Sequence, residues 1–528
     1  MNAFLLLIVL VILFLFILIH KKVKKSLGYW KERGVPYVKP WPIFGNMSSV
    51  VFRKISFPNL LEEVYRLFYN NRYFGFYQFS TPTLIINDID LIKQICIKEF
   101  DKFPDHADSL PKESDPFWNR GLFAMEGKDW HDMRTVLSPA FTSSKMKAML
   151  HLMTECAEEF VEHFESQTSD LITLDMRDVF TRLTNDVIAS CAFGFKCNSF
   201  RQQNNEFYET GKEAFDFSGF KGLKFFGSSI SPTLMKMLKV TIFSKSLTNF
   251  FSRIVKETIQ YREKRGLVRP DMIHLLREAQ KGRLQNDSEN SDYSINPFKT
   301  DSSKKTVITD EDIVCQAAIF FFGGYDTVGS LLCNLVYELA LNPDIQDKLI
   351  EEVDETFDAC NGKITYEALM GMKYLDMVIS ETLRLWTPAT FLNRKCVKPF
   401  TIQPFIPGEK PLHIESGTEC MIPAFAIHRD SRYFPNPNKF DPERFSDENK
   451  SRIQPFTYFP FGIGPRICIG NRFALLEIKT GIFYLLTRFK LVPVEKTSIP
   501  FVIDKSSIVL RHEHGYWLGL KRRSKAAA

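Results

Sequence analysis

The stretch PFGIGPRICIG, residues 460–470, sets one cysteine among glycines and an arginine at fixed spacing. Gly464 permits a tight turn with close approach of the backbone, because glycine lacks a Cβ atom. Cys468 comes just before a predicted helix that begins near residue 470, and amide groups at a helix N-terminus favour thiolate over thiol. A thiolate in that position is a good metal ligand. The alternative is a buried structural cysteine in a glycine-rich turn.

The metal can be inferred from what the sequence places near this cysteine. A zinc site needs three or four protein ligands, and no second cysteine or histidine lies close to Cys468 in the sequence. One thiolate alone suits the axial position of haem iron, because the porphyrin supplies four further ligands. The residue types therefore allow haem ligation by Cys468, with a buried structural cysteine as the alternative.

A second polar interruption is AIFFFGGYDTV, residues 318–328, within an apolar run. Each glycine in a buried helix costs about 1 kcal/mol relative to alanine, and a buried carboxylate needs partners. Thr309 and Asp312 have capping-box spacing and predict where this helix starts, while Asn342–Pro343 predicts its end. A helix over 310–341 would be about 48 Å long and would run through the core.

Other patterns predict the remaining elements. Helical periodicity covers 56–71, 146–167 and 247–265, short β-like runs cover 73–79 and 83–88, and a last helix covers about 470–488. Residues 281–306 are polar and predict a surface loop. The fold class is mainly α with a small β subdomain.

The N-terminus predicts a membrane anchor. Ala3–Ile19 are 17 consecutive apolar residues, followed at once by lysines. A cleaved signal peptide would carry its positive charge before the apolar run, so an uncleaved anchor is favoured. The positive-inside rule then places the rest of the chain in the cytoplasm. Residues 1–20 are the predicted transmembrane helix, and 21–45 are a basic, proline-rich spacer.

Bulk composition sets the outer limits. The chain has 528 residues, a net charge of +6 and ten cysteines without a C-x-x-C pair. This length alone suggests three or four domains, and the cysteines suggest a reducing compartment. The chain has no arginine-rich tract that would indicate binding to nucleic acid. The 49 phenylalanines predict an aromatic core or an apolar cavity.

The 460–470 stretch resembles the haem-binding loop of the cytochrome P450 family, the haem-thiolate monooxygenases. The match F-x-x-G-x-R-x-C-x-G comprises Phe461, Gly464, Arg466, Cys468 and Gly470. Further motifs follow in the family's order, and they supply Glu381 and Arg384 from ETLR, Arg444 from FDPERF, and Trp130 and Arg134 from WHDMR. The resemblance implies a buried Glu–Arg–Arg network behind the haem loop. It also implies haem-propionate contacts from Trp130, Arg134, Arg466 and Arg394, although Arg394 could instead be a surface residue.

The resemblance covers nearly the whole chain and implies one catalytic domain over 46–528, which overrules the domain count from length. It implies haem b and insertion of one oxygen atom from O2 into lipophilic small molecules. Segments such as LSPAFTSSKMKAM are most like those of microsomal insect enzymes that oxidise foreign compounds and plant toxins. Insecticides and endogenous lipids or hormones are further classes of substrate that the resemblance implies for this chain.

Asp326 and Thr327 match the family's acid–alcohol pair, which guides protons to bound dioxygen, and an alcohol suits a relay because it both donates and accepts. The alternative is a helix-kink hydrogen-bond pair. The family often has a second hydroxyl next, where this chain has Val328. Helical spacing puts Phe320, Gly323, Gly324 and Thr327 on one face of this helix, which would look onto the haem. By family position, the other predicted residues of the substrate pocket are Phe117, Trp118, Phe123, Thr390, Phe391, Ser507 and Ile508. An entrance in the membrane would use Phe215, Phe217, Phe220, Phe225 and Phe226, which could equally cover the core.

Electrons must come from outside, since the chain has no P-loop and no G-x-G-x-x-G motif. The implied partners are a membrane-anchored NADPH–cytochrome P450 reductase, cytochrome b5 as an optional second donor, and lipid of the endoplasmic reticulum membrane. Two rival functions are a haem-thiolate isomerase or dehydratase that needs no reductase, and a non-catalytic haem carrier or sensor. The haem loop of the first rival often carries insertions and it does not need the acid–alcohol pair, so the uninterrupted loop and the pair in this chain argue against it.

Overall fold

The computed structural model describes residues 26–107, 115–202, 205–215, 243–282, 308–507 and 509–523, with a few residues between 216 and 242. The predicted anchor, part of the spacer and nearly all of the polar loop 281–306 lie outside these residues. In the described part of the chain, only α15 (Asp310–Leu341) has the length and apolar character to cross a membrane. Its most apolar stretch is nevertheless 67% buried inside the protein.

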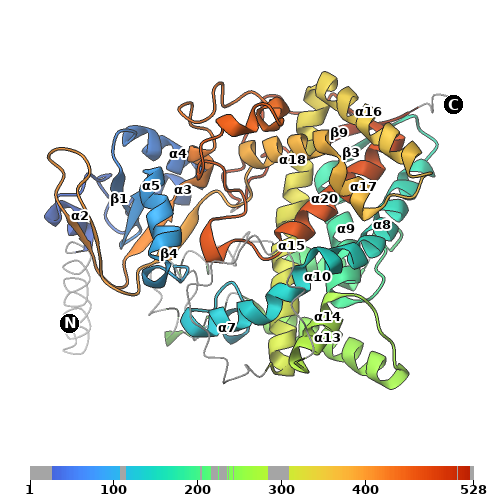
Figure 1. Cartoon of the computed structure of the whole chain (residues 1–528), viewed down its shortest axis with the longest axis horizontal. Coiled ribbons are helices and arrows are strands. Elements are labelled where there is room, and N and C mark those ends of the chain that lie inside the picture. Colours follow the sequence, from blue (N-terminus) through green and yellow to red (C-terminus); the bar gives the residue numbers. More distant parts are fainter. Residues whose placement is uncertain are drawn as a thin grey trace, which may run out of the picture.

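Helices make up one side of the molecule, and a smaller part at the other side contains most of the short strands (Figure 1). The helices are α2 (Tyr29–Glu32), α3 (Ser48–Val51), α4 (Phe57–Leu67), α5 (Ile89–Lys93), α6 (Pro116–Asn119), α7 (Gly127–Leu137), α8 (Ser143–Glu165), α9 (Met176–Ile188), α10 (Glu206–Ala214), α13 (Lys245–Arg265), α14 (Met272–Gln280), α15, α16 (Pro343–Ala359), α17 (Tyr366–Gly371), α18 (Lys373–Leu385), α19 (Ala424–Ile427) and α20 (Asn471–Arg488). The predicted class, mainly α with a small β portion, is confirmed.

The described strands form three small sheets. The largest has the order β1–β2–β7–β4, built from Tyr73–Gln78, Thr81–Ile86, Glu419–Ile422 and Leu392–Lys395. A second sheet has the order β3–β9–β8, from Leu171–Asp175, Trp517–Arg522 and Phe489–Pro493. The third pairs β5 (Phe400–Ile402) with β6 (Leu412–Ile414). The first sheet matters for the site, because β4 carries Arg394.

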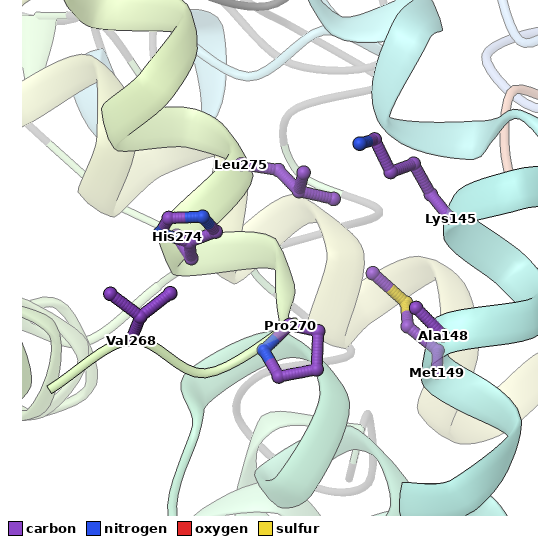
Figure 2. Close-up of a pocket in the computed structure, with 7 residues that line it drawn as sticks. All are labelled: Lys145, Ala148, Met149, Val268, Pro270, His274 and Leu275. Carbon is purple, nitrogen blue, oxygen red and sulfur yellow. The ribbon is translucent and has the colours of Figure 1, made fainter.

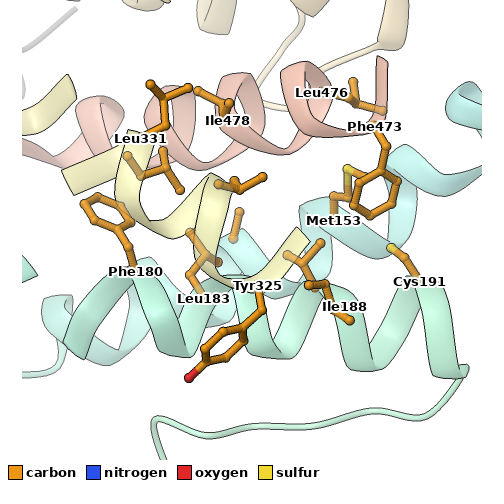
Figure 3. Packing of buried hydrophobic residues seen from close by; sticks show 14 of the residues in the cluster. Met153, Phe180, Leu183, Ile188, Cys191, Tyr325, Leu331, Phe473, Leu476 and Ile478 are labelled. Atoms are coloured by element: carbon orange, nitrogen blue, oxygen red, sulfur yellow. The ribbon is translucent and has the colours of Figure 1, made fainter. Parts of the chain in front are cut away.

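The helix α15 is the centre of the core. Thr309 caps it, and the predicted capping box with Asp312 is present in both directions. Figure 3 shows α15 lying between α9 and α20, with Leu183 and Ile188 of α9 on one side and Ile478 of α20 on the other. The predictions for this helix and for the last helix, α20, are confirmed. Such packing on both sides explains the apolar sequence of α15.

A buried acid connects the end of α15 to the end of α18. Glu338 Oε1 accepts a hydrogen bond of 2.8 Å from the indole N–H of Trp386. Burial raises the pKa of Glu338 from its ordinary value near 4.5 to about 7, against the lowering effect of that hydrogen bond. The folded protein therefore favours the protonated form of this carboxyl group.

We expect Glu338→Gln to make stability less sensitive to pH. The pKa of Glu338 is higher in the folded than in the unfolded chain. Its contribution to the free energy of unfolding is therefore complete below the unfolded pKa and is lost as pH rises through about 7. Relative to Glu338→Gln, wild type should lose about 2 kcal/mol between roughly pH 5 and pH 8. Thermal unfolding at several pH values measures this, and parallel curves for the two proteins would contradict it.

Candidate functional site

The loop before α20 is shaped by close backbone packing. Gly464 has a φ of +74°, and a Cβ atom there would lie 2.1 Å from the carbonyl oxygen of Cys96. The Cys468 N–H donates to the Phe461 carbonyl at 2.9 Å and closes the loop. Gly470 is the N-cap residue of α20, so Cys468 stands just before the helix. Both the tight turn at Gly464 and the start of the helix follow the sequence prediction.

Cys468 is the only exposed cysteine among the ten, since the other nine are buried or partly buried. The protein around the thiol raises its pKa, whereas a hydrogen bond from the Gly470 backbone and the charge of Arg134 lower it. In the protein alone the thiol form is therefore favoured, contrary to the sequence prediction, because desolvation outweighs the Gly470 hydrogen bond and the charge of Arg134. A cation bound to the sulfur would supply the missing stabilisation, because coordinated thiols are deprotonated.

Two buried arginines near this loop have unused donors. Arg466 donates to the carbonyls of Pro104 and Met125 and pairs with Asp105, while its Nη1 has no partner in the described structure. Arg394 is 1% exposed, so it is not a surface residue, and its Nε is likewise without a partner there. A buried N–H group without a partner is costly, even on a guanidinium whose other nitrogens are hydrogen-bonded. These donors fit the propionate carboxylates of a haem, which arginine binds well.

Trp130 and Arg134 lie on α7 at this same place. The guanidinium carbon of Arg466 stands 4.0 Å from the centre of the Trp130 ring. Burial lowers the pKa of Arg134 to about 10, and the nearby Cys468 raises it. The structure thus brings Arg466 against Trp130 and Arg134 close to Cys468.

Sequence reasoning missed two neighbours of these arginines. Asp105 is buried, accepts the Gly127 N–H at 2.7 Å and so fixes the start of α7 beside Arg466. His106 bonds Asn393 through Nδ1 at 2.9 Å. Burial, with Arg394 and Arg466 next to it, lowers the pKa of His106 to about 3, so it is neutral. Neither residue stands in a pattern that would have identified it.

Glu381, Arg384 and Arg444 come together behind the loop. Arg384 of α18 binds both carboxylate oxygens of Glu381, at 2.7 and 2.8 Å, and also donates to the His428 carbonyl. Arg444 donates to Glu381 Oε1 at 3.3 Å. Glu381 and Arg384 are completely buried. The carboxylate therefore joins α18 to the irregular chain that precedes the cysteine loop.

Asp326 and Thr327 of α15 have different surroundings. Thr327 Oγ1 donates to the Gly323 carbonyl one turn earlier. Asp326 is 2% exposed, and its Oδ1 accepts from Arg511 at 2.7 Å and from Arg177 of α9. Two guanidinium groups thus compensate the charge of this buried carboxylate. The sequence did not indicate either arginine.

The two glycines of α15 face different neighbours. A Cβ atom on Gly323 would meet nothing within 4 Å, whereas one on Gly324 would lie 2.8 Å from the Cδ1 atom of Ile188. Gly323 therefore opens to free space on the side of Thr327, while Gly324 allows α9 to pack closely. Phe320 packs its ring against Phe141, at 5.4 Å between centroids.

The other predicted pocket residues fall in three places. The segment 116–125, which comprises α6 and the chain after it and is called the loop 116–125 below, carries Phe117, Trp118 and Phe123. The Trp118 ring contacts Phe322 of α15 at 5.9 Å. Thr390 and Phe391 follow α18, where Phe391 packs against Phe57 at 5.4 Å. Ser507 has a buried hydroxyl without a partner in the described structure. Ile508, Phe217, Phe220, Phe225 and Phe226 lie outside the described residues, whereas Phe215 stacks on Tyr325 at 5.3 Å.

A pocket of about 190 Å³ lies elsewhere, between α8 and the start of α14 (Figure 2). Apolar side chains such as Met149 and Leu275 line it, with Lys145 and His274 beside them. It contains none of the residues predicted for the site.

Comparisons with known proteins agree on one family. The family model described as "Cytochrome P450" matches residues 35–518. "Cytochrome P450 9e2" of Blattella germanica is 43% identical over 94% of either chain. "Probable cytochrome P450 9f2" of Drosophila melanogaster is 42% identical over 94% of this chain and 95% of its own. "Cytochrome P450 6k1" of Blattella germanica is 36% identical, with 92% and 91% covered.

Proposed function

Because the chain belongs to the cytochrome P450 family of haem-thiolate monooxygenases, we propose that it oxidises lipophilic foreign compounds, such as plant toxins or insecticides. One oxygen atom of O2 enters the substrate, and the electrons come from NADPH through a membrane-anchored reductase. The observation that carries the proposal is the exposed Cys468 before α20, in a loop where Arg466 and the adjoining Arg394 have unused buried donors. The similarity to insect proteins supports the substrate class.

In this proposal the residues of the chain hold the cofactor. Cys468 would bind the iron of haem b through its thiolate, and Arg466, Arg394, Arg134 and Trp130 would bind its propionates. Haem iron with a thiolate ligand supplies activation of O2, because thiolate donation favours cleavage of the O–O bond. Gly464 and the Glu381 network hold the cysteine loop in place, and Gly323 leaves room above Thr327.

Proton delivery is proposed for Thr327 and Asp326. The Thr327 hydroxyl donates to the Gly323 carbonyl, so its oxygen can accept a hydrogen bond from water. To pass its own proton onward, the hydroxyl must turn away from that carbonyl as it takes up a proton from the water. Asp326 Oδ1 is engaged by Arg177 and Arg511. A proton transfer that uses this oxygen therefore requires one of the two contacts to open.

We expect Thr327→Ala to uncouple NADPH use from product formation. NADPH consumption should continue while product per NADPH falls, by up to about 10²-fold, because a positioned acid–base group is lost. Thr356→Ala is the matched control, since Thr356 on α16 makes the same bond to the carbonyl four residues earlier, at 2.7 Å. Full coupling in Thr327→Ala would refute the relay.

Membrane attachment belongs to the same proposal. The apolar run 3–19 and the lysines after it support a single-pass anchor in the endoplasmic reticulum membrane, with the catalytic domain on the cytoplasmic side. The anchor brings the chain to the bilayer that holds the reductase, cytochrome b5 and lipophilic substrates.

The direct test of the proposed function is reconstitution of the full chain with reductase, NADPH and O2 against a panel of lipophilic compounds. Oxygenated products that require the reductase support the proposal. Turnover without reductase would point to the isomerase alternative. A thiolate-type carbon monoxide spectrum without turnover on any compound would point to a carrier or sensor.

A further inference from the structure

One buried amide side chain holds the loop 116–125 on α15. Gln316 is completely buried near the start of that helix. Its Nε2 donates to the Arg120 carbonyl at 2.7 Å, and its Oε1 accepts from the Leu122 N–H at 2.9 Å. The two hydrogen bonds flank Gly121 and satisfy the amide on both sides. Such a paired contact fixes the backbone of the loop in position and direction.

The loop also touches the helix directly. A Cβ atom on Gly121 would lie 2.1 Å from the Cγ1 atom of Ile319, so the backbone of the loop rests on this side chain. Arg120 and Asp312 form an ion pair at 3.5 Å. Asp312, Gln316 and Ile319 share one face of α15, at spacings of four and three residues. Three successive contacts therefore hold residues 120–122 against one stripe of the helix.

Aromatic residues stand on both sides of this clamp in the sequence, and the Trp118 and Phe123 rings are 5.9 Å apart. Trp118 contacts Phe322 at 5.9 Å and stacks on Phe243 at 5.4 Å. Phe123 stacks on His106 at 4.7 Å. Ile319 lies one turn before Gly323 on the same face of α15, and the missing side chain of Gly323 leaves free space there. The distance between the loop and α15 therefore determines how far the Trp118 and Phe123 rings stand from that space.

We propose that Gln316 is a positioning residue that sets which substrate sizes reach the open face at Gly323. Its two hydrogen bonds hold the loop 116–125 close to α15. Glycine is required at position 121 because no side chain fits between the loop backbone and Ile319. This inference rests on the proposed function and deepens it, because it assigns size selection among lipophilic substrates to one clamp outside the acid–alcohol pair and the haem loop.

The chain offers a matched control. Gln346 is also completely buried, donates to the Leu339 and Leu491 carbonyls at 3.0 and 2.9 Å, and accepts the Leu491 N–H at 2.7 Å. It joins α16 to β8 and has no contact with the loop. Gln316→Leu and Gln346→Leu each remove a buried amide that bridges backbone groups, and only the first releases residues 120–122.

The test uses full-length haem-loaded enzyme and two readouts. Hydrogen exchange should be about tenfold faster at the Leu122 amide in Gln316→Leu and unchanged in Gln346→Leu, because one backbone hydrogen bond is lost. Spectral titration with imidazole and 4-phenylimidazole gives the ratio of the two Kd values. That ratio should change by about tenfold in Gln316→Leu. A tenfold change is typical of how strongly an apolar pocket discriminates between ligands of slightly different size. It should stay within about twofold in Gln346→Leu.

A second pair of variants covers the case in which Gln316→Leu does not fold. Gly121→Ala should shift the azole ratio in the same direction, and Gly121→Ala with Ile319→Ala should restore it. Equal azole ratios in wild type, Gln316→Leu and Gly121→Ala would overturn the clamp. A wild-type protein without a haem spectrum would overturn the proposed function instead, while hydrogen exchange would still report on the loop.

Discussion

Cys468→Ser abolishes the thiolate-type carbon monoxide spectrum and reduces product formation to background. Cys468 is the only exposed cysteine of the ten and stands before α20, so no other thiol replaces it. The loss should exceed the roughly 10–100-fold that removal of a partner of a metal ligand costs, since the ligand itself is gone. Spectra of the reduced protein with carbon monoxide, together with haem content per chain, measure it.

Cys360→Ser is the control for this change. Cys360 is partly exposed and follows α16, away from the loop. It should keep both spectrum and activity. A Cys468→Ser protein that retained a thiolate-type spectrum would show that the wrong ligand had been assigned.

Glu381→Gln destabilises the protein by about 3–5 kcal/mol, because it leaves two arginines buried without their counter-charge. Arg384 makes two of its hydrogen bonds to this carboxylate, and Arg444 makes a third contact. Since Glu381 also accepts the Asp441 N–H at 2.9 Å, the chain before the cysteine loop should loosen as well. Denaturant unfolding measures the loss, and haem retention reports on the loop.

The nearby Glu443 provides the comparison. It pairs with Lys348 at 2.6 Å, with both side chains about half exposed. Surface pairs of this kind contribute about 0–1 kcal/mol, so Glu443→Gln should be nearly silent. Equal losses for Glu381→Gln and Glu443→Gln would mean that the buried network does not support the fold in the way described.

Sequence patterns correctly predicted those structural features that depend only on residues close together in the chain. The capping box of Thr309 and Asp312 gave the start of α15, and the 460–470 motif gave the turn and helix around Cys468. These features arise within a few residues, where backbone hydrogen bonds and missing side chains decide the conformation. The same holds for β1 and β2, whose runs were visible in the sequence.

Contacts between distant segments were not predictable in this way. Arg177, which precedes Asp326 in the chain, and Arg511, which follows it, both pair with this carboxylate. Gln316 forms a hydrogen bond to a loop almost 200 positions earlier. Gly324 was assigned to the pocket from helical spacing, yet it packs against Ile188 of α9. Periodicity identifies a helix face, but only the packed neighbours decide what that face meets.

The most direct test of the central claim is oxygen labelling. The full chain with reductase and NADPH, given a lipophilic substrate under ¹⁸O2, should yield a product that carries one labelled oxygen atom, by mass spectrometry. Omission of NADPH or reductase should abolish that product. An unlabelled product, or one formed equally well without reductase, would contradict the monooxygenase account.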